Sequence, residues 1–233
     1  MLLQSNSKIQ ILDEGVDGRD GPRVIVATTG SVGLGQRLRA FVSEAARGNV
    51  FKNLKLREAT TRVSTNFLQD CQKSFVPHSS HSGWGFGAIL AAVIEGKPHL
   101  VEYDVSTFQP EVREDKLHFV SMGSGQTLAD PFLAFVSRVL WKSQQPTLQE
   151  AKLGVYWALS HTIALAPGGV GGEIKLAALR QVDGNWIASL LENAQEQAEH
   201  IEALERSIAD YATNFFREAS VVPLPPPPGA AAE

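Results

Sequence analysis

The sequence predicts an α+β fold in which antiparallel sheets lie between pairs of helices, a four-layer αββα architecture. Along the 233 residues, the pattern runs strands, two helices, strands, two helices, strand. Two consecutive helices between strand blocks argue against a parallel βαβ array and favour sandwiched antiparallel sheets. Two glycine-rich corners, residues 28–35 and 123–129, each join an apolar strand to an amphipathic helix.

Composition predicts one domain with an ordinary buried core, because 43% of the residues are hydrophobic. The formal net charge of −4 gives no electrostatic reason to expect nucleic acid or an anionic membrane as a partner, so we expect a peptide, protein or small molecule. The longest apolar run, residues 88–94, is far shorter than the ~20 residues of a membrane helix. The single cysteine, Cys71, excludes an internal disulfide, and we expect a buried thiol and a cytoplasmic protein.

The first half of the chain predicts a hairpin followed by two helices. Residues 8–13 alternate in polarity, residues 15–21 are rich in turn formers, and residues 23–29 are β-branched and apolar. Apolar residues then recur at three- and four-residue intervals over 34–46 and 56–71, which indicates two helices with one buried face each.

The middle of the chain repeats this pattern. A strand over 84–94 turns at residues 95–98 into a strand over 99–105, which predicts a second hairpin. A strand over 119–122 is expected to enter the second glycine corner, followed by a helix over 127–140. The next helix, about 147–164, begins at Thr147, and Glu150 completes a capping box.

The C-terminal third divides into three predicted segments. A strand over 174–179 ends the main domain, residues 1–183, after a glycine-rich loop. Residues 184–217 are expected to form one long helix with a near-heptad apolar stripe from Leu190 to Phe215, and we expect this stripe to pack against a neighbouring subunit. The tail, residues 218–233, is rich in proline and alanine and is expected to be disordered or extended.

The segment Lys8-Ile9-Gln10-Ile11-Leu12, the two glycine corners and the spacing of the helix pairs together resemble the proteasome-type β subunits of the N-terminal-nucleophile hydrolases. In that family an N-terminal threonine or serine attacks a peptide carbonyl, with its own α-amine as base. The resemblance implies that Lys8 keeps this amine unprotonated and that the Gly30 N–H binds the oxyanion. It also implies that Ser124 helps to organise the amine and that Thr28 lines the substrate side-chain pocket.

The same resemblance implies a homo-oligomeric ring, peptide or unfolded-protein substrates, a possible ATP-driven unfoldase partner, and no cofactor or metal. Two features depart from the family. Residues 166–172 lack its late acidic residue and serine, and the two strands that carry the nucleophile have no counterpart before Met1. We therefore expect this chain, as written, to be inactive, either because its start is truncated or because it is a non-catalytic structural subunit of a ring.

Simpler interpretations remain open for each of these residues. Lys8 alone is typical of a solvated strand lysine, Gly30 can serve only to turn the chain, and Ser124 can cap the following helix. A phosphate-binding turn of an NAD(P)-dependent oxidoreductase is a less favoured alternative, because the third glycine comes one residue early and no strand follows the first helix. His78 and His81 are expected to be solvated loop histidines rather than to bind zinc together with His99.

Overall fold

The computed structural model describes residues 8–12, 23–74, 85–113, 118–166, 169–191 and 194–219. The chain forms two compact units, Met1–Ala194 and Gln195–Glu233. The first unit contains two antiparallel sheets and five of the six helices, and the second contains helix α6. This mixed α+β architecture agrees with the predicted fold class.

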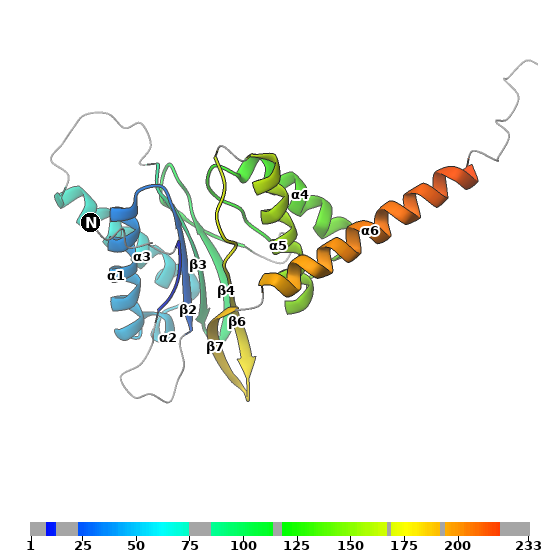
Figure 1. Ribbon diagram of the computed structural model, residues 1–233. Coiled ribbons are helices and arrows are strands. Elements are labelled where there is room, and N and C mark those ends of the chain that lie inside the picture. The colour runs from blue at the N-terminus through cyan, green and yellow to red at the C-terminus, as the bar shows by residue number, and fades with distance from the viewer. Residues whose placement is uncertain are drawn as a thin grey trace, which may run out of the picture. The chain divides into compact units, whose positions relative to one another are not determined.

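The larger sheet has five strands in the order β1-β2-β3-β4-β5, and every neighbouring pair is antiparallel (Figure 1). The strands, in chain order, are β1 Ile9–Leu12, β2 Val24–Thr29, β3 Gly87–Ile94, β4 Lys97–Tyr103 and β5 Pro110–Val112. Both predicted hairpins therefore pair as expected, although the turn between β1 and β2 lies outside the described residues.

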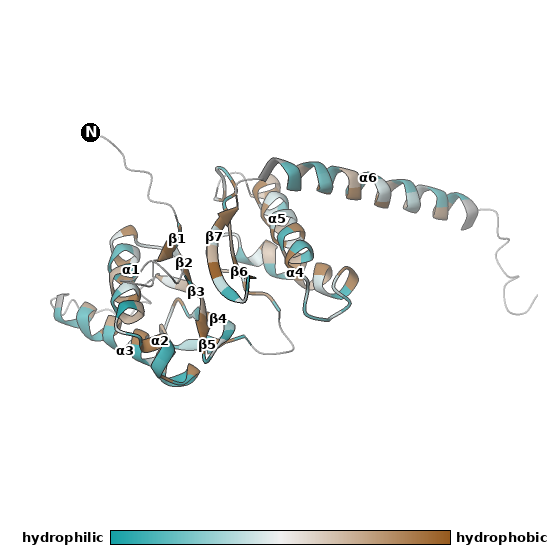
Figure 2. Ribbon diagram, turned by 90° about the horizontal axis from the view of Figure 1, so that it is seen from below, coloured by the Kyte–Doolittle hydropathy of each residue, from teal (hydrophilic) through white to brown (hydrophobic). Residues whose placement is uncertain are grey.

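Three helices cover one face of this sheet (Figure 2). They are α1 Val32–Arg47, the short α2 Val50–Asn53 and α3 Leu56–Ser74. Their apolar faces and the inward residues of the sheet form the main core, which includes a cluster of aromatic rings around Phe67 and Phe108, whose centroids are 4.7 Å apart. Cys71 is fully buried in this core, and burial raises the pKa of its thiol, as expected of an inert cysteine.

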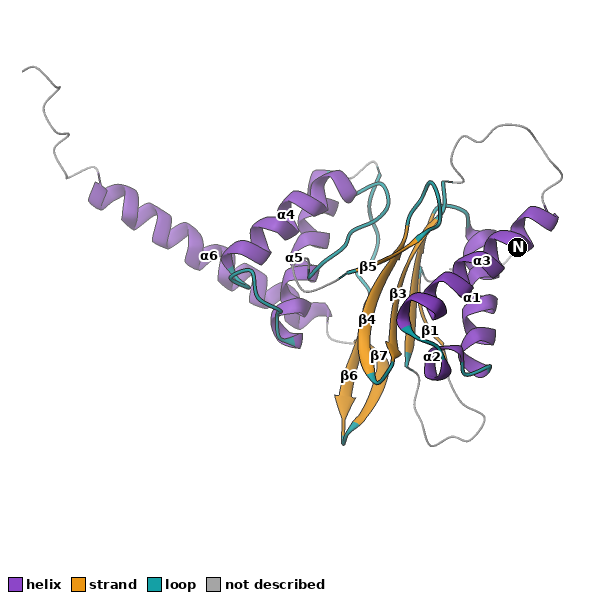
Figure 3. Ribbon diagram, turned by 180° about the vertical axis from the view of Figure 1, so that it is seen from behind, coloured by secondary structure: helices purple, strands orange, loops and turns teal. Residues whose placement is uncertain are grey.

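The other face of the five-stranded sheet meets the smaller sheet, in which β6 Leu176–Val182 pairs with β7 Asn185–Leu191. Helices α4 Gln126–Val139 and α5 Leu148–Leu165 pack against each other, and α5 contacts β6 (Figure 3). The capping box at the start of α5 is present, because Thr147 and Glu150 exchange hydrogen bonds as predicted. The buried Trp141, which follows α4, packs closely against Gly154 of α5, and this contact is consistent with the packing of the two helices.

Two predicted elements are wrong. Residues 119–122 do not form a strand, because they pair with no other strand in either of the two sheets. Residues 185–191, assigned to the long helix, form strand β7 instead. Asp183 and Gly184 both have positive φ, 49° and 81°, as a tight hairpin turn requires, and this turn folds β7 back onto β6.

The second unit contains the helix α6, Ala194–Ala219. This helix begins ten residues later than the predicted helix, which begins at residue 184. Ile208, Tyr211 and Phe215 follow one another at helical spacing and are exposed. Residues 220–233 of the predicted tail lie outside the described residues. No helix within the described parts of the chain has the length and apolar character needed to cross a membrane.

Candidate functional site

Lys8 lies beside the end of β2, where the first glycine corner begins. The backbone carbonyl of Lys8 accepts a hydrogen bond of 3.1 Å from the N–H of Thr28, which continues the β1–β2 ladder by one residue. Paired residues of an antiparallel ladder share a face of the sheet, so Lys8 and Thr28 lie on the same face. The Thr28 hydroxyl on that face approaches α1, because a Cβ on Gly35 would lie 2.9 Å from its Oγ1.

Gly30 forms a corner that no other residue can occupy without strain. Its φ is +90°, and a Cβ at this position would lie 1.9 Å from the carbonyl oxygen of Gly85. The chain that leads into β3 therefore passes directly over the end of β2. The requirement for glycine here is set by this contact as well as by the turn into α1, whose N-cap is Ser31.

The second glycine corner packs against the first. Gly123 has φ +101°, and a Cβ there would lie 2.9 Å from Oγ1 of Thr29. Because successive residues of a strand point to opposite faces, Thr29 meets the second corner on the face opposite to Thr28. The two corners, distant in sequence, are thus in contact at one end of the sheet.

Ser124 belongs to this second corner but is directed to a different segment. Its hydroxyl donates a 3.0 Å hydrogen bond to the carbonyl oxygen of Gly169, in the loop after α5. The neighbouring Gly125 is packed as closely, since a Cβ there would lie 2.7 Å from Cγ2 of Thr162. Ser124 therefore ties the second corner to the glycine-rich loop, and it lies on the Thr29 side of the sheet end rather than on the Lys8 side.

Sequence reasoning missed Thr29. The four predicted site residues, Lys8, Thr28, Gly30 and Ser124, come from the segments that meet at this end of the sheet, but Thr29 makes the contact between the two corners. The sequence signal is the alternation of side chains between the two faces of β2, which places Thr29 on the face opposite to Thr28. No group of three or more His, Cys, Asp or Glu side chains suited to a metal ion occurs among the described residues.

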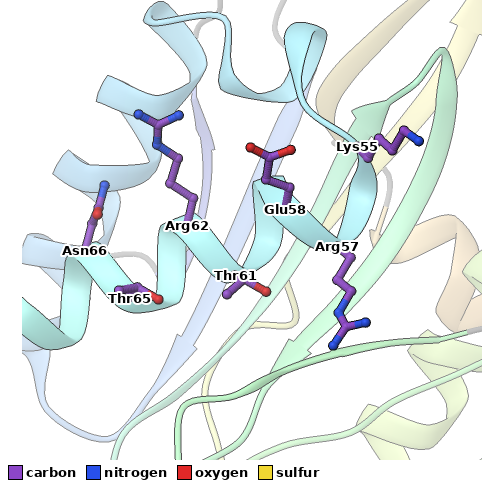
Figure 4. A pocket seen from close by; sticks show the side chains of 7 residues that line it. All are labelled: Lys55, Arg57, Glu58, Thr61, Arg62, Thr65 and Asn66. Carbon is purple, nitrogen blue, oxygen red and sulfur yellow. The ribbon is translucent and has the colours of Figure 1, made fainter.

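Two hollows of the surface lie away from the glycine corners. One of about 610 Å³ is lined by residues 55–66 around the first turns of α3, with Arg62 and Asn66 pointing away from Arg57 (Figure 4). A second, of about 530 Å³, is lined in part by His99 and Arg113. Burial lowers the pKa of His99, and Arg113 forms ion pairs with Glu102 and Glu111. His78 and His81 lie outside the described residues.

Comparisons with solved structures identify the fold. The chain is similar to Anbu from Hyphomicrobium sp. strain MC1, with a TM-score of 0.61, 15% sequence identity, and coverage of 87% of this chain and 84% of that one. It is also similar to the Anbu complex from Pseudomonas aeruginosa, solved as a helical assembly, with a TM-score of 0.58, 16% identity, and coverage of 96% and 94%. No protein-family model matches the chain, and no curated protein matches it significantly.

These comparisons correct the resemblance drawn from the sequence. Both solved structures are of Anbu, a family distinct from the proteasome-type β subunits, so the assignment to the β subunits is wrong. At 15% and 16% identity the likeness establishes a shared fold. The structure is therefore that of an α+β protein with a fold similar to that of Anbu and with two glycine corners in contact.

Proposed function

We propose that this protein is a self-associating subunit of a proteasome-like particle in the cytoplasm, built in the manner of an Anbu complex. The observation that carries this proposal is the likeness in fold, over 96% of the chain, to a protein solved as a helical assembly. The exposed apolar stripe of α6 supports it, since contiguous apolar side chains on a soluble protein are typical of a contact surface.

The proposal includes the four-layer arrangement expected from the sequence. Helices α1–α3, the five-stranded sheet, the β6–β7 sheet and the α4–α5 pair would be its four layers. In such a sandwich the strands of both sheets end at a common edge of the domain, where chain segments from different layers meet. The contact of Gly123 with Thr29 is consistent with this position for the site.

For the site, the proposed chemistry is peptide-bond hydrolysis of the threonine type. Gly30 would donate its N–H to the developing oxyanion, and Lys8 would keep a nearby amine unprotonated. Thr28 would line the substrate side-chain pocket, and Ser124 would help to organise the amine. Substrates would be peptides or unfolded chains, delivered where needed by an ATP-driven unfoldase. The alternative is a non-catalytic subunit that contributes only structure to the assembly.

The antiparallel sheets count against the oxidoreductase alternative. A dinucleotide site of the common type needs a parallel βαβ unit, with the helix after the glycine turn leading to a parallel strand. All the ladders among the described residues are antiparallel.

Light scattering combined with turnover of fluorogenic peptides tests the proposal. A multi-subunit particle whose turnover is abolished by Lys8→Ala would support the hydrolase and would contradict the expected inactivity of the chain as written. Lys52→Ala on α2 is the matched control for loss of one lysine. A particle with no turnover would support the structural subunit. A monomer at micromolar concentration would contradict both.

A further inference from the structure

Two helices of this chain carry partly exposed apolar stripes of the same length and spacing. On α4, Leu128, Phe132, Phe135 and Val139 follow at intervals of four, three and four residues; on α6, Leu204, Ile208, Tyr211 and Phe215 do the same. Phe135 is 42% exposed and Val139 47%, while Ile208 is 46% exposed and Tyr211 73%. The α4 stripe is thus open to contact at Phe135 and Val139, whereas Phe132 packs against Trp157 and His161 of α5; the α6 stripe is open from Ile208 to Phe215.

The spacing suits helix-on-helix packing. Side chains at intervals of four and three residues form one seam along a helix, and seams of equal length interdigitate along their whole length. Each stripe spans eleven residue steps, or about 16 Å at 1.5 Å per residue. The aromatic members are already paired along each stripe, with ring centroids of Phe132 and Phe135 6.2 Å apart and those of Tyr211 and Phe215 6.4 Å apart.

Charge gives the pair an orientation. Helix α6 carries six carboxylates against two arginines, a formal charge of −4 that equals that of the entire chain. Arg138 comes one residue before Val139 at the end of the α4 stripe, and Glu205 comes one residue after Leu204 at the start of the α6 stripe. An antiparallel arrangement places these two opposite charges at the same end of the seam and also opposes the two helix dipoles favourably.

We propose that α6 of one copy packs antiparallel against α4 of a second copy, with Phe135 opposite Ile208 and Val139 opposite Leu204. This inference rests on the proposed function, since it names the surface by which copies associate. The occupant of the α4 stripe is therefore a second copy of this chain, chosen by matched apolar spacing and by the opposite charges of Arg138 and Glu205. Burial of both stripes removes the exposed side chains of Phe135, Val139, Ile208, Tyr211 and Phe215 from water.

Cysteine cross-linking between two single variants of the full chain tests the contact. On a Cys71→Ala background, Phe135→Cys and Ile208→Cys are purified separately, mixed and mildly oxidised. We expect a disulfide-linked dimer in the mixture and none in either protein alone. Ala134→Cys mixed with Ala209→Cys is the matched control, because both positions are exposed but lie off the stripes, and it should give no dimer.

The outcomes separate this inference from the proposed function. Particles that assemble by light scattering but yield no mixed dimer would overturn the α4–α6 contact and leave the assembly standing, whereas a monomer would contradict both. An intramolecular cross-link in the Phe135→Cys/Ile208→Cys double variant would also overturn it. Substitution of two charged residues gives a second measurement that should leave the fold intact. Arg138→Glu should weaken association about tenfold, and adding Glu205→Arg should restore most of the lost affinity. Failure of this restoration, with both proteins folded, would contradict the antiparallel orientation.

Discussion

Gly123 lies against Thr29, so closely that a Cβ on Gly123 would come within 2.9 Å of the threonine Oγ1. This relationship joins the two glycine corners, one at the end of β2 and the other before α4. It locates the candidate site at one end of the sheet and explains why both corners need glycine. The predictions below begin with this contact.

Gly123→Ala should lower the free energy of unfolding by about 2 to 4 kcal/mol, since it adds steric overlap to an unfavourable positive φ. Gly172→Ala is the matched control. Its φ of +96° is similar, but its Cβ would meet nothing within 4 Å, so about 1 to 2 kcal/mol is expected. Thr29→Ala should recover at least about 1 kcal/mol of the Gly123→Ala loss in a double-mutant cycle followed by urea unfolding. Additive losses would show that the two corners do not touch.

Gly30→Ala should be more damaging, by about 3 kcal/mol or more, because the new methyl group would meet backbone of Gly85 that cannot move aside. Gly33→Ala, three residues on, places its Cβ in open space within α1 and should be neutral or stabilising by up to about 1 kcal/mol. Thermal melts of both variants measure the difference. Equal melting temperatures would contradict the close approach of Gly85 to Gly30.

Asp104 should stabilise the turn between β4 and β5 in a pH-dependent way. Hydrogen bonds from the Ser106 hydroxyl and from the Thr107 N–H lower the pKa of its carboxyl to about 2. Since the folded pKa is depressed below the unfolded value of about 3.9, this stabilisation is present above pH ~4 and is lost as the pH falls toward 2. Asp104→Asn should cost about 1 kcal/mol at pH 7 and progressively less below pH 4. A cost that did not change between pH 7 and pH 2 would argue against the charged hydrogen bonds.

Dinucleotides should not bind the first glycine corner. Only a ligand that prefers the folded state raises the melting temperature, so NAD or NADP at millimolar concentration should leave it unchanged. The reason is geometric: the sheet at this corner is antiparallel, whereas a dinucleotide site of the common type needs a parallel βαβ unit. A saturable rise of several degrees with either dinucleotide would revive the oxidoreductase interpretation.

The elements with strong local signals could be predicted from the sequence. Helices α1, α3, α4 and α5 follow from apolar periodicity, and the start of α5 follows from Thr147 and Glu150. Strand β7 was missed because its apolar residues precede those of α6 without interruption, so a single helical stripe seemed to run through both. Asp183-Gly184, a strong hairpin signal, marked the boundary that periodicity alone did not.

The site could be predicted only in part. The glycine corners are visible locally, since glycine beside an apolar strand marks a turn, but their mutual contact depends on how the two sheets pack. The face of β2 that meets the second corner is set by alternation, which directs Thr29 and not Thr28 toward Gly123. The bond from Ser124 to Gly169 joins segments that no local pattern relates.

Native mass spectrometry of the full-length protein tests the central claim, self-association of this fold, most directly. The account predicts ions at multiples of the 25.2 kDa subunit mass under conditions in which the protein is folded and at micromolar concentration. Arg138→Glu should shift the distribution toward smaller species. A spectrum containing only the 25.2 kDa species would contradict the account.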